Sequence, residues 1–190
     1  MSELFKKVKS FVDESFQYDQ AQIRHFDRTV YWLQQLHPAA DEVLLIAAYA
    51  HDIERAFRSP EDSHESSGKK FTDKDALEKH QKVGAQIIGD FLMKNGADNM
   101  VIEKVKHLIS AHEVGGDEDQ NILKDSDSLS FLENNAAIFI PRLKKLGYDK
   151  IKEKFDWMFN RISSSGAKRI AKPFYDKMIA ELEEAEAAIT

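Results

Sequence analysis

The sequence contains no cysteine and only four prolines and eight glycines among its 190 residues. Without cysteine the chain cannot form disulfides, thiolate metal sites or a thiol nucleophile. It also lacks an apolar run long enough for a signal peptide or a membrane span, so we expect a cytoplasmic protein that has no membrane partner. A domain of this length buries roughly 70% of the surface that its unfolded chain exposes, so one domain over residues 1–190 needs no covalent staple.

The sequence also has no excess of positive charge, because the formal net charge is −6. Its lysines and arginines form no dense basic stripe along the chain. Such a stripe is needed to follow a nucleic-acid backbone, so DNA and RNA polymers are not expected partners. A small anionic substrate is not excluded by the negative balance, since a bound cation would dominate the local field.

Several common site motifs are incomplete. Gly116 stands where a zinc-protease helix would place its second histidine after His112. Ile122 occupies the glycine position of a calcium loop that would begin at Asp117. The segment Gly68-Lys69-Lys70 lacks the upstream glycine of a phosphate-binding loop, and no serine has the context of an elbow-type nucleophile.

Helical periodicity dominates the sequence, and strand patterns are almost absent. We expect helices over 3–17, 21–36, 41–57, 73–95, 98–112, 121–133, 136–146, 149–162 and 167–188. The run 43–50 is apolar on all sides, which indicates a buried central helix. The predicted fold is therefore all-α, a single compact helical bundle of about eight or nine helices, with a core over roughly 20–135 and the C-terminal helices 136–188 packed on it.

Four histidines and two aspartates are candidates for one buried site. They are His25, His51, Asp52, His80, His112 and Asp127. The histidines and Asp127 share helix faces with apolar residues, and Asp52 lies about 100° further round the helix from His51. One inward histidine is more often a hydrogen-bonded core residue than a ligand. Buried together, however, these groups would have a large desolvation cost without a shared cation, so the set predicts a divalent metal site.

The ordered set resembles the HD-domain superfamily of metal-dependent phosphohydrolases, whose signature is a histidine, a His-Asp doublet and a distant aspartate on an all-α core. Here these are His25, the doublet His51-Asp52 within Ala50-His51-Asp52-Ile53, and Asp127. The resemblance covers roughly residues 20–135. Ser126 departs from the usual Asp-Ala-Asp-x-Leu pattern, which leaves Asp125 as an alternative ligand, and Asp127 is preferred because it aligns with the aspartate before x-Leu.

The segments around His80 and His112 are similar to two further histidine positions of that superfamily, which ligate a second ion or face the substrate. The resemblance implies one or two divalent ions, of Mn, Fe, Co, Ni or Mg. The implied reaction is hydrolysis of a phosphate ester or anhydride of a small molecule by metal-activated water, with nucleotides as one candidate class. Asp52 would be the catalytic residue. Arg55 and Arg58 could bind the phosphate, although solvated helix-end cations explain them equally well.

Two alternatives stay open. Inositol-oxygenase-like and phosphonate-oxygenase-like proteins have the same order of six ligands, and there the site holds two irons that activate dioxygen. A degenerate HD bundle could instead serve as a non-catalytic binding or signalling module, but the intact ligand set argues against this.

Residues 58–72 have the proline, serine and glycine content of a loop. A loop this long in a compact domain is usually functional or disordered. Since it follows the His-Asp doublet within two turns, we expect it to border the site entrance. It would act either as a lid that brings Arg58 and His64 toward an anionic substrate or as a surface insertion.

Overall fold

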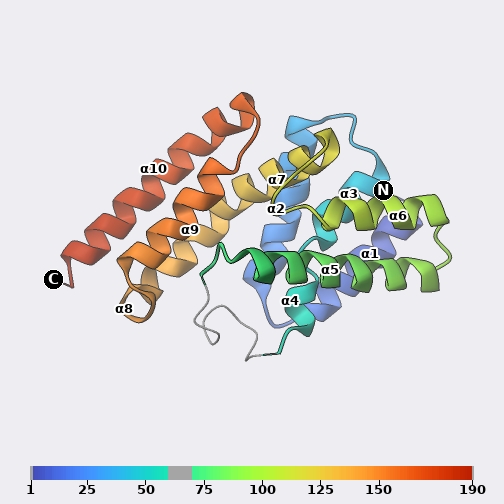
Figure 1. Ribbon diagram of the computed structural model, residues 1–190, viewed down its shortest axis with the longest axis horizontal. Helices are drawn as coiled ribbons and strands as arrows, with labels where there is room; N and C mark the ends of the chain where they lie inside the picture. The colour runs from blue at the N-terminus through green and yellow to red at the C-terminus, as the bar shows by residue number, and fades with distance from the viewer. Residues whose placement is uncertain (1, 60–69, 190) are drawn as a thin grey trace.

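The computed structural model describes residues 2–59 and 70–189, and every regular element in these residues is helical (Figure 1). Eight helices have nine residues or more: α1 (Glu3–Ser15), α2 (Gln20–Leu36), α3 (Glu42–Ala50), α5 (Lys74–Lys94), α6 (Asn99–Ile109), α7 (Glu118–Ser130), α9 (Tyr148–Asn160) and α10 (Ser165–Ala187). The shorter elements are α4 (Glu54–Phe57), the π-helical turn η2 (Phe131–Asn135), the 3-10 helix η3 (Ala136–Arg142) and α8 (Leu143–Leu146). The predicted all-α bundle is confirmed.

No helix in the described part of the chain is long and apolar enough to cross a bilayer.

Aspartate caps set the start of several helices. Asp41, Asp73 and Asp98 each accept a hydrogen bond from a backbone N–H in the first turn of the helix that follows. Asp117 forms a capping box with Gln120, in which each side chain accepts from the backbone of the other. The acidic segment 117–120, expected to be a loop, is therefore the cap and first turn of α7.

The segment 41–57, predicted as one helix, is interrupted at the His-Asp doublet. α3 ends at Ala50, and Ile53, Arg55 and Ala56 donate to carbonyl oxygens three residues earlier, as in a 3-10 turn. The doublet His51-Asp52 therefore occupies a tight turn between α3 and α4. Both side chains are buried there, so they face the interior although no continuous helix passes the site.

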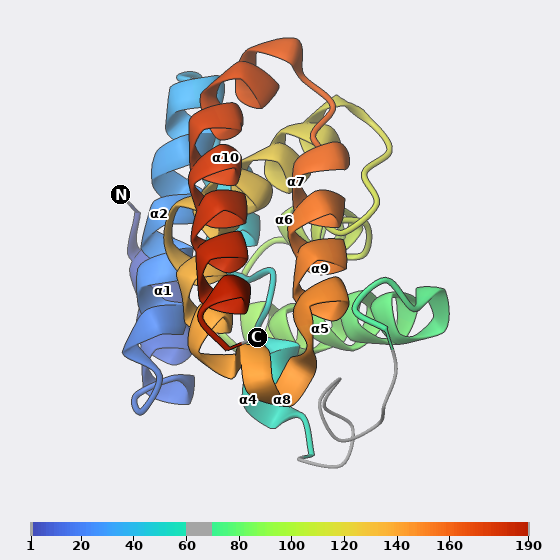
Figure 2. The same ribbon diagram turned by 90° about the vertical axis from the view of Figure 1, so that its left-hand side faces the viewer.

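Two hydrophobic clusters form the interior. The first is built mainly from α1, α2, α3, α5 and α6, and the second mainly from η2, α9 and α10. α7 runs between these two groups of helices and contributes Leu123 to the first cluster and Leu129 to the second (Figure 1). α9 and α10 lie side by side, on the side of α7 that faces away from the first cluster (Figure 2). The α7 segment between the two leucines thus lies where the clusters meet.

This middle segment of α7 is polar although it is buried. Ser126 and Ser128 donate to carbonyl oxygens four residues earlier, which satisfies both hydroxyls within the helix. The Asp125 carboxylate accepts from the backbone N–H groups of Ser163 and Ser164 at 2.7 and 2.8 Å, and so holds the connection between α9 and α10. These partners remove the penalty for placing polar groups in the core.

The expected lid cannot be assessed, because residues 60–69, including His64, lie outside the described residues. Arg58 and Ser59 before this gap and the cap of α5 after it are described.

We predict that Asp125→Ala lowers the free energy of unfolding by about 1.5–3 kcal/mol, because the backbone N–H groups of Ser163 and Ser164 lose a charged acceptor. Urea unfolding followed by circular dichroism would measure this change. Asp90→Ala is the matched control: Asp90 is exposed on α5, so its removal should shift stability by less than about 0.5 kcal/mol. Equal midpoints for the two variants would contradict the assigned role of Asp125.

Candidate metal centre

The structure brings all six predicted ligand residues together, and none of them is more than 5% exposed. They come from α2, the turn after α3, α5, the turn after α6, and α7. The ring centroid of His51 lies 5.2 Å from that of His25 and 5.1 Å from that of His112, which in turn lies 5.2 Å from that of His80. The four imidazoles therefore form a continuous row.

The two aspartates lie along this row. Oδ1 of Asp127 is 3.1 Å from Nε2 of His25 and 3.5 Å from Nε2 of His51. Oδ1 of Asp52 is 2.9 Å from Nε2 of His80 and 3.7 Å from Nε2 of His112. Oδ2 of Asp52 is also 3.8 Å from Nε2 of His51, so Asp52 lies beside the middle of the row, whereas Asp127 lies at its His25 end.

Backbone carbonyls determine the tautomers of the two central histidines. Nδ1 of His51 donates to the carbonyl of Ala48 at 3.0 Å, and Nδ1 of His112 donates to that of Ile109 at 2.8 Å. Because a carbonyl only accepts, the proton of each neutral ring is on Nδ1 and the lone pair is on Nε2. In the described residues, both Nε2 atoms are buried without a hydrogen-bond partner. Such unpaired atoms are costly, and coordination of a cation would satisfy them.

Ser130 orients His25 in the same way. Its hydroxyl donates to the carbonyl of His25 at 2.8 Å, so its oxygen accepts from Nδ1 of His25, also at 2.8 Å. The lone pair on Nε2 of His25 then faces Asp127. Three separate backbone or hydroxyl contacts therefore turn three lone pairs toward the same centre, which fits a metal site.

Two overlapping groups of residues have donor atoms within 4.8 Å of one another. One group contains His25, His51 and Asp52, and the other contains Asp52, His80, His112 and Glu113. Asp52 belongs to both, so its carboxylate could bridge two ions. The arrangement is compatible with one or two divalent cations and does not distinguish among Mn, Fe, Co, Ni and Mg.

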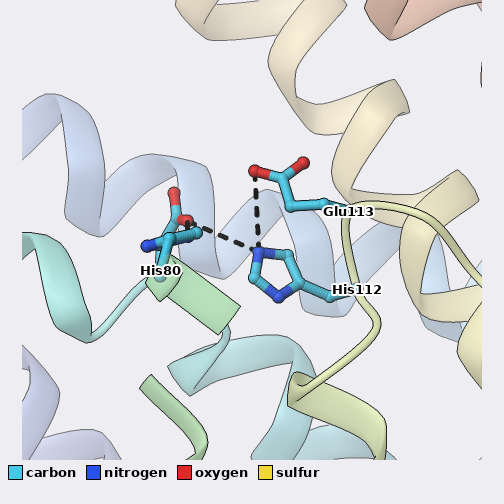
Figure 3. Close-up of side chains that lie close together, drawn as sticks. His80, His112 and Glu113 are labelled. Carbon is cyan, nitrogen blue, oxygen red and sulfur yellow. Dashed lines mark hydrogen bonds and ion pairs between the residues drawn. The ribbon is translucent and has the colours of Figure 1, made fainter. Parts of the chain in front are cut away.

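Glu113 was not among the residues predicted from the sequence. Its Oε1 lies 3.9 Å from Nε2 of His112, and Figure 3 shows this imidazole nitrogen directed at the Glu113 carboxylate. The Gln81 side chain accepts from the backbone N–H of Glu113 at 2.9 Å and fixes its position. The one signal for Glu113 in the sequence is its place directly after the candidate ligand His112.

Arg161, at the end of α9, was missed as well. Its guanidinium group donates to the carboxylates of Glu113 and Asp127 and to the hydroxyl of Ser128. Burial raises the pKa of both acids, but Arg161 and the neighbouring cationic groups together outweigh it, so the pKa of Glu113 falls to about 2 and that of Asp127 falls well below its usual range. Both carboxylates are therefore ionised at neutral pH. No motif marks Arg161, which is far from Asp127 along the chain.

Arg55 and Arg58, predicted to bind substrate, both have partners within the protein. Nε of Arg55 is 2.7 Å from Oδ2 of Asp52. Nε of Arg58 is 3.0 Å from both oxygens of Glu54, which also contacts Nδ1 of His80 at 2.7 Å. A carboxylate on the outer nitrogen is the usual partner of a metal-binding histidine. Substrate binding by these two arginines stays a prediction.

A cavity of about 250 Å³ opens onto the cluster. Five residues of the cluster line it: His25, Asp52, His80, Glu113 and Asp127. The elements η2, η3 and α9 contribute further lining residues, which are Phe131, Asn135, Phe139, Arg142, Lys154 and Met158. The volume is slightly below the roughly 300–1,000 Å³ of pockets for drug-sized ligands, so the cavity suits a small molecule.

Comparison with known proteins agrees with this architecture. The family model described as "Domain of unknown function (DUF4202)" matches residues 9–183. The chain belongs to this family. No curated protein matches the sequence.

A solved structure shares this fold. The crystal structure of a predicted HD superfamily hydrolase from an uncultured Thermotogales bacterium is similar, with a TM-score of 0.58, 97% of this chain and 92% of that chain covered, and 20% sequence identity. Such a likeness establishes the fold, and the resemblance predicted from the sequence is confirmed at that level.

We predict that His51→Ala and Asp52→Ala each abolish tightly bound metal, because each removes a donor from the centre of the cluster. Elemental analysis of the purified variants would measure the metal per chain. His107→Ala is the control, since His107 is exposed and paired with Asp117 away from the cavity. Full metal content in either cluster variant would refute the assignment.

We also predict that metal binding releases protons. Burial lowers the pKa of His51, but the carboxylates of Asp52 and Asp127 outweigh it and raise that pKa to about 9. At neutral pH a cation must therefore displace a proton from Nε2, and the apparent affinity should rise with pH until about pH 9, by up to about tenfold per unit for one displaced proton. Titration with Mn²⁺ in weakly buffered solutions would show it, and a pH-independent affinity would contradict it.

Proposed function

We propose that the protein is a metal-dependent phosphohydrolase that cleaves a phosphate ester or anhydride of a small molecule. The supporting observation is the pair of buried, unpaired Nε2 atoms of His51 and His112 beside the cavity. The ion or ions would be held by His25, His51, Asp52, His80, His112 and Asp127, with Glu113 as an additional donor. A divalent cation bound there would lower the pKa of a coordinated water and neutralise charge on phosphoryl oxygens.

The charges of the cavity wall support an anionic substrate. Among the described residues, the wall contains the four acids Asp19, Asp52, Glu113 and Asp127 and the four bases Arg55, Arg58, Arg142 and Lys154. With neutral imidazoles these charges cancel, so each divalent ion would add two uncompensated positive charges. A small site with this field attracts phosphate.

Asp52 is the residue to which we assign the catalytic role. Burial raises the pKa of its carboxyl group, but Arg55 and His51 outweigh burial and hold it well below its usual range. The ionised carboxylate has Oδ2 on Arg55 and Oδ1 toward His80, which fixes its orientation. It would therefore be available as an acceptor that orients the attacking water.

A di-iron oxygenase is the second candidate, because Asp52 is shared by two adjacent groups of donors and such a bridging carboxylate also suits two irons. A non-catalytic module is disfavoured by the complete set of oriented donors.

The proposed hydrolase is tested by loading the purified chain with Mn²⁺, Co²⁺, Ni²⁺ or Mg²⁺ and measuring phosphate release from a panel of phosphate esters and nucleotides. We expect turnover with at least one metal, and Asp52→Asn should lower it by about 10²–10⁴-fold, as for loss of a group that acts on the attacking water. His107→Ala should retain the wild-type rate. Two irons per chain with substrate-dependent dioxygen consumption and no phosphate release would instead establish the oxygenase.

A further inference from the structure

Lys154 on α9 differs from the other cations near the cavity. The residue lines the cavity and is only 8% exposed. Its Nζ lies over aromatic rings, 4.6 Å from the centroid of Trp157 and 5.2 Å from that of Phe131. Within residues 2–59 and 70–189 it forms no ion pair with a carboxylate. By contrast, Arg55 pairs with Asp52, and Arg58 pairs with Glu54.

Burial of this ammonium group lowers the stability of the folded protein. Burial lowers the pKa of Lys154 to about 8, so the group is still largely charged at neutral pH. Contacts with ring faces offset only part of the penalty for burying a charge without a counter-ion. A buried cation that faces a cavity and lacks an internal partner is suited to a ligand that supplies the missing negative charge.

The wall around Lys154 is aromatic. The ring of Phe139 packs against Phe131 and Phe71, with centroids 5.8 and 5.7 Å away. Asn135 belongs to the same π-helical turn as Phe131, and among the residues that the structure describes its Oδ1 is buried without a hydrogen-bond partner. Such π-helical turns occur frequently at functional sites. We call Lys154, Phe131, Asn135 and Phe139 the distal wall, because α9, η2 and η3 carry it and the metal-binding helices do not.

We propose that the substrate carries a second anionic group, a carboxylate or a phosphate, which Lys154 binds while the aromatic rings of the distal wall pack against an apolar or ring-shaped body between the two anions. This inference rests on the proposed function, since the first anion is the phosphoryl group at the metal centre. It assigns Lys154 as a residue that determines specificity.

The test uses phosphonates, which are not hydrolysed. Benzylphosphonate has one anionic group, 4-carboxybenzylphosphonate adds a carboxylate, and 1,4-xylylenediphosphonate adds a second phosphonate. Isothermal titration calorimetry on the Mn²⁺-loaded full chain gives a Kd for each probe. We expect the second anion to tighten binding to the wild-type protein about tenfold, as for a hydrogen bond between charged groups.

Three variants make the test specific. In Lys154→Met, which keeps the length of the side chain against the rings, the ratio of Kd values should fall to about one. Lys154→Arg should restore most of the ratio. Lys150→Met is the matched control, because Lys150 is on the same helix and over the ring of Phe71 but does not line the cavity; it should keep the wild-type ratio. Circular dichroism would confirm that all three variants fold.

The proposal is overturned if the wild-type protein shows no preference for the doubly anionic probes, fails to bind them, or keeps its preference in Lys154→Met. If only one probe shows the effect, that probe identifies the second anion as carboxylate or phosphate. Failure of the hydrolase proposal would look different: the Kd ratio and its loss in Lys154→Met would persist while no phosphate ester is turned over.

Discussion

The carboxylates of Asp52 and Asp127 are buried where the two hydrophobic clusters meet, and each must find a counter-charge there. Without one, an ionised group in the core would cost several kcal/mol. Arg55, in the adjacent helical turn, forms an ion pair with Asp52. Arg161, at the C-terminal end of α9, forms an ion pair with Asp127. The four histidines of the cluster also lie around these two carboxylates. Because these charges must be compensated, α2, α7 and α9 come together at the cluster. The packing of the two hydrophobic clusters follows from this requirement.

The C-terminal helices are therefore part of the site. The sequence resemblance extended only over roughly residues 20–135, and the later helices were expected to pack on that core. In addition, α9 contributes Arg161 to the acidic side of the cluster and Lys154 to the lining of the cavity. The short π-helical turn η2 places Phe131 and Asn135 in the same lining. The candidate metal ligands come from the N-terminal two thirds of the chain, whereas much of the rest of the cavity lining comes from the last third.

Hydrogen bonds around the cluster determine the orientation and the tautomer of its histidines. Ala48 and Ile109 hold two imidazoles in the tautomer that turns Nε2 inward, Ser130 does the same for His25, and Glu54 contacts the outer nitrogen of His80. These contacts orient the donors before any ion binds. Because the fold itself directs the Nε2 atoms, metal binding requires loss of the His51 proton but little movement of side chains, which favours a preorganised centre.

The sequence by itself determined the all-α class and the six clustered residues, because both depend on local information: apolar spacing along a helix shows which side chains face inward. It could not show that α3 stops before His51, since the change to three-residue hydrogen bonds leaves the apolar pattern unaltered. The different surroundings of Asp125 and Asp127, and the contacts of Glu113, Arg161 and Lys154, were decided by tertiary structure. Their partners lie on other elements, often more than thirty residues away, and only the packing of α9 against α7 brings the charges within reach.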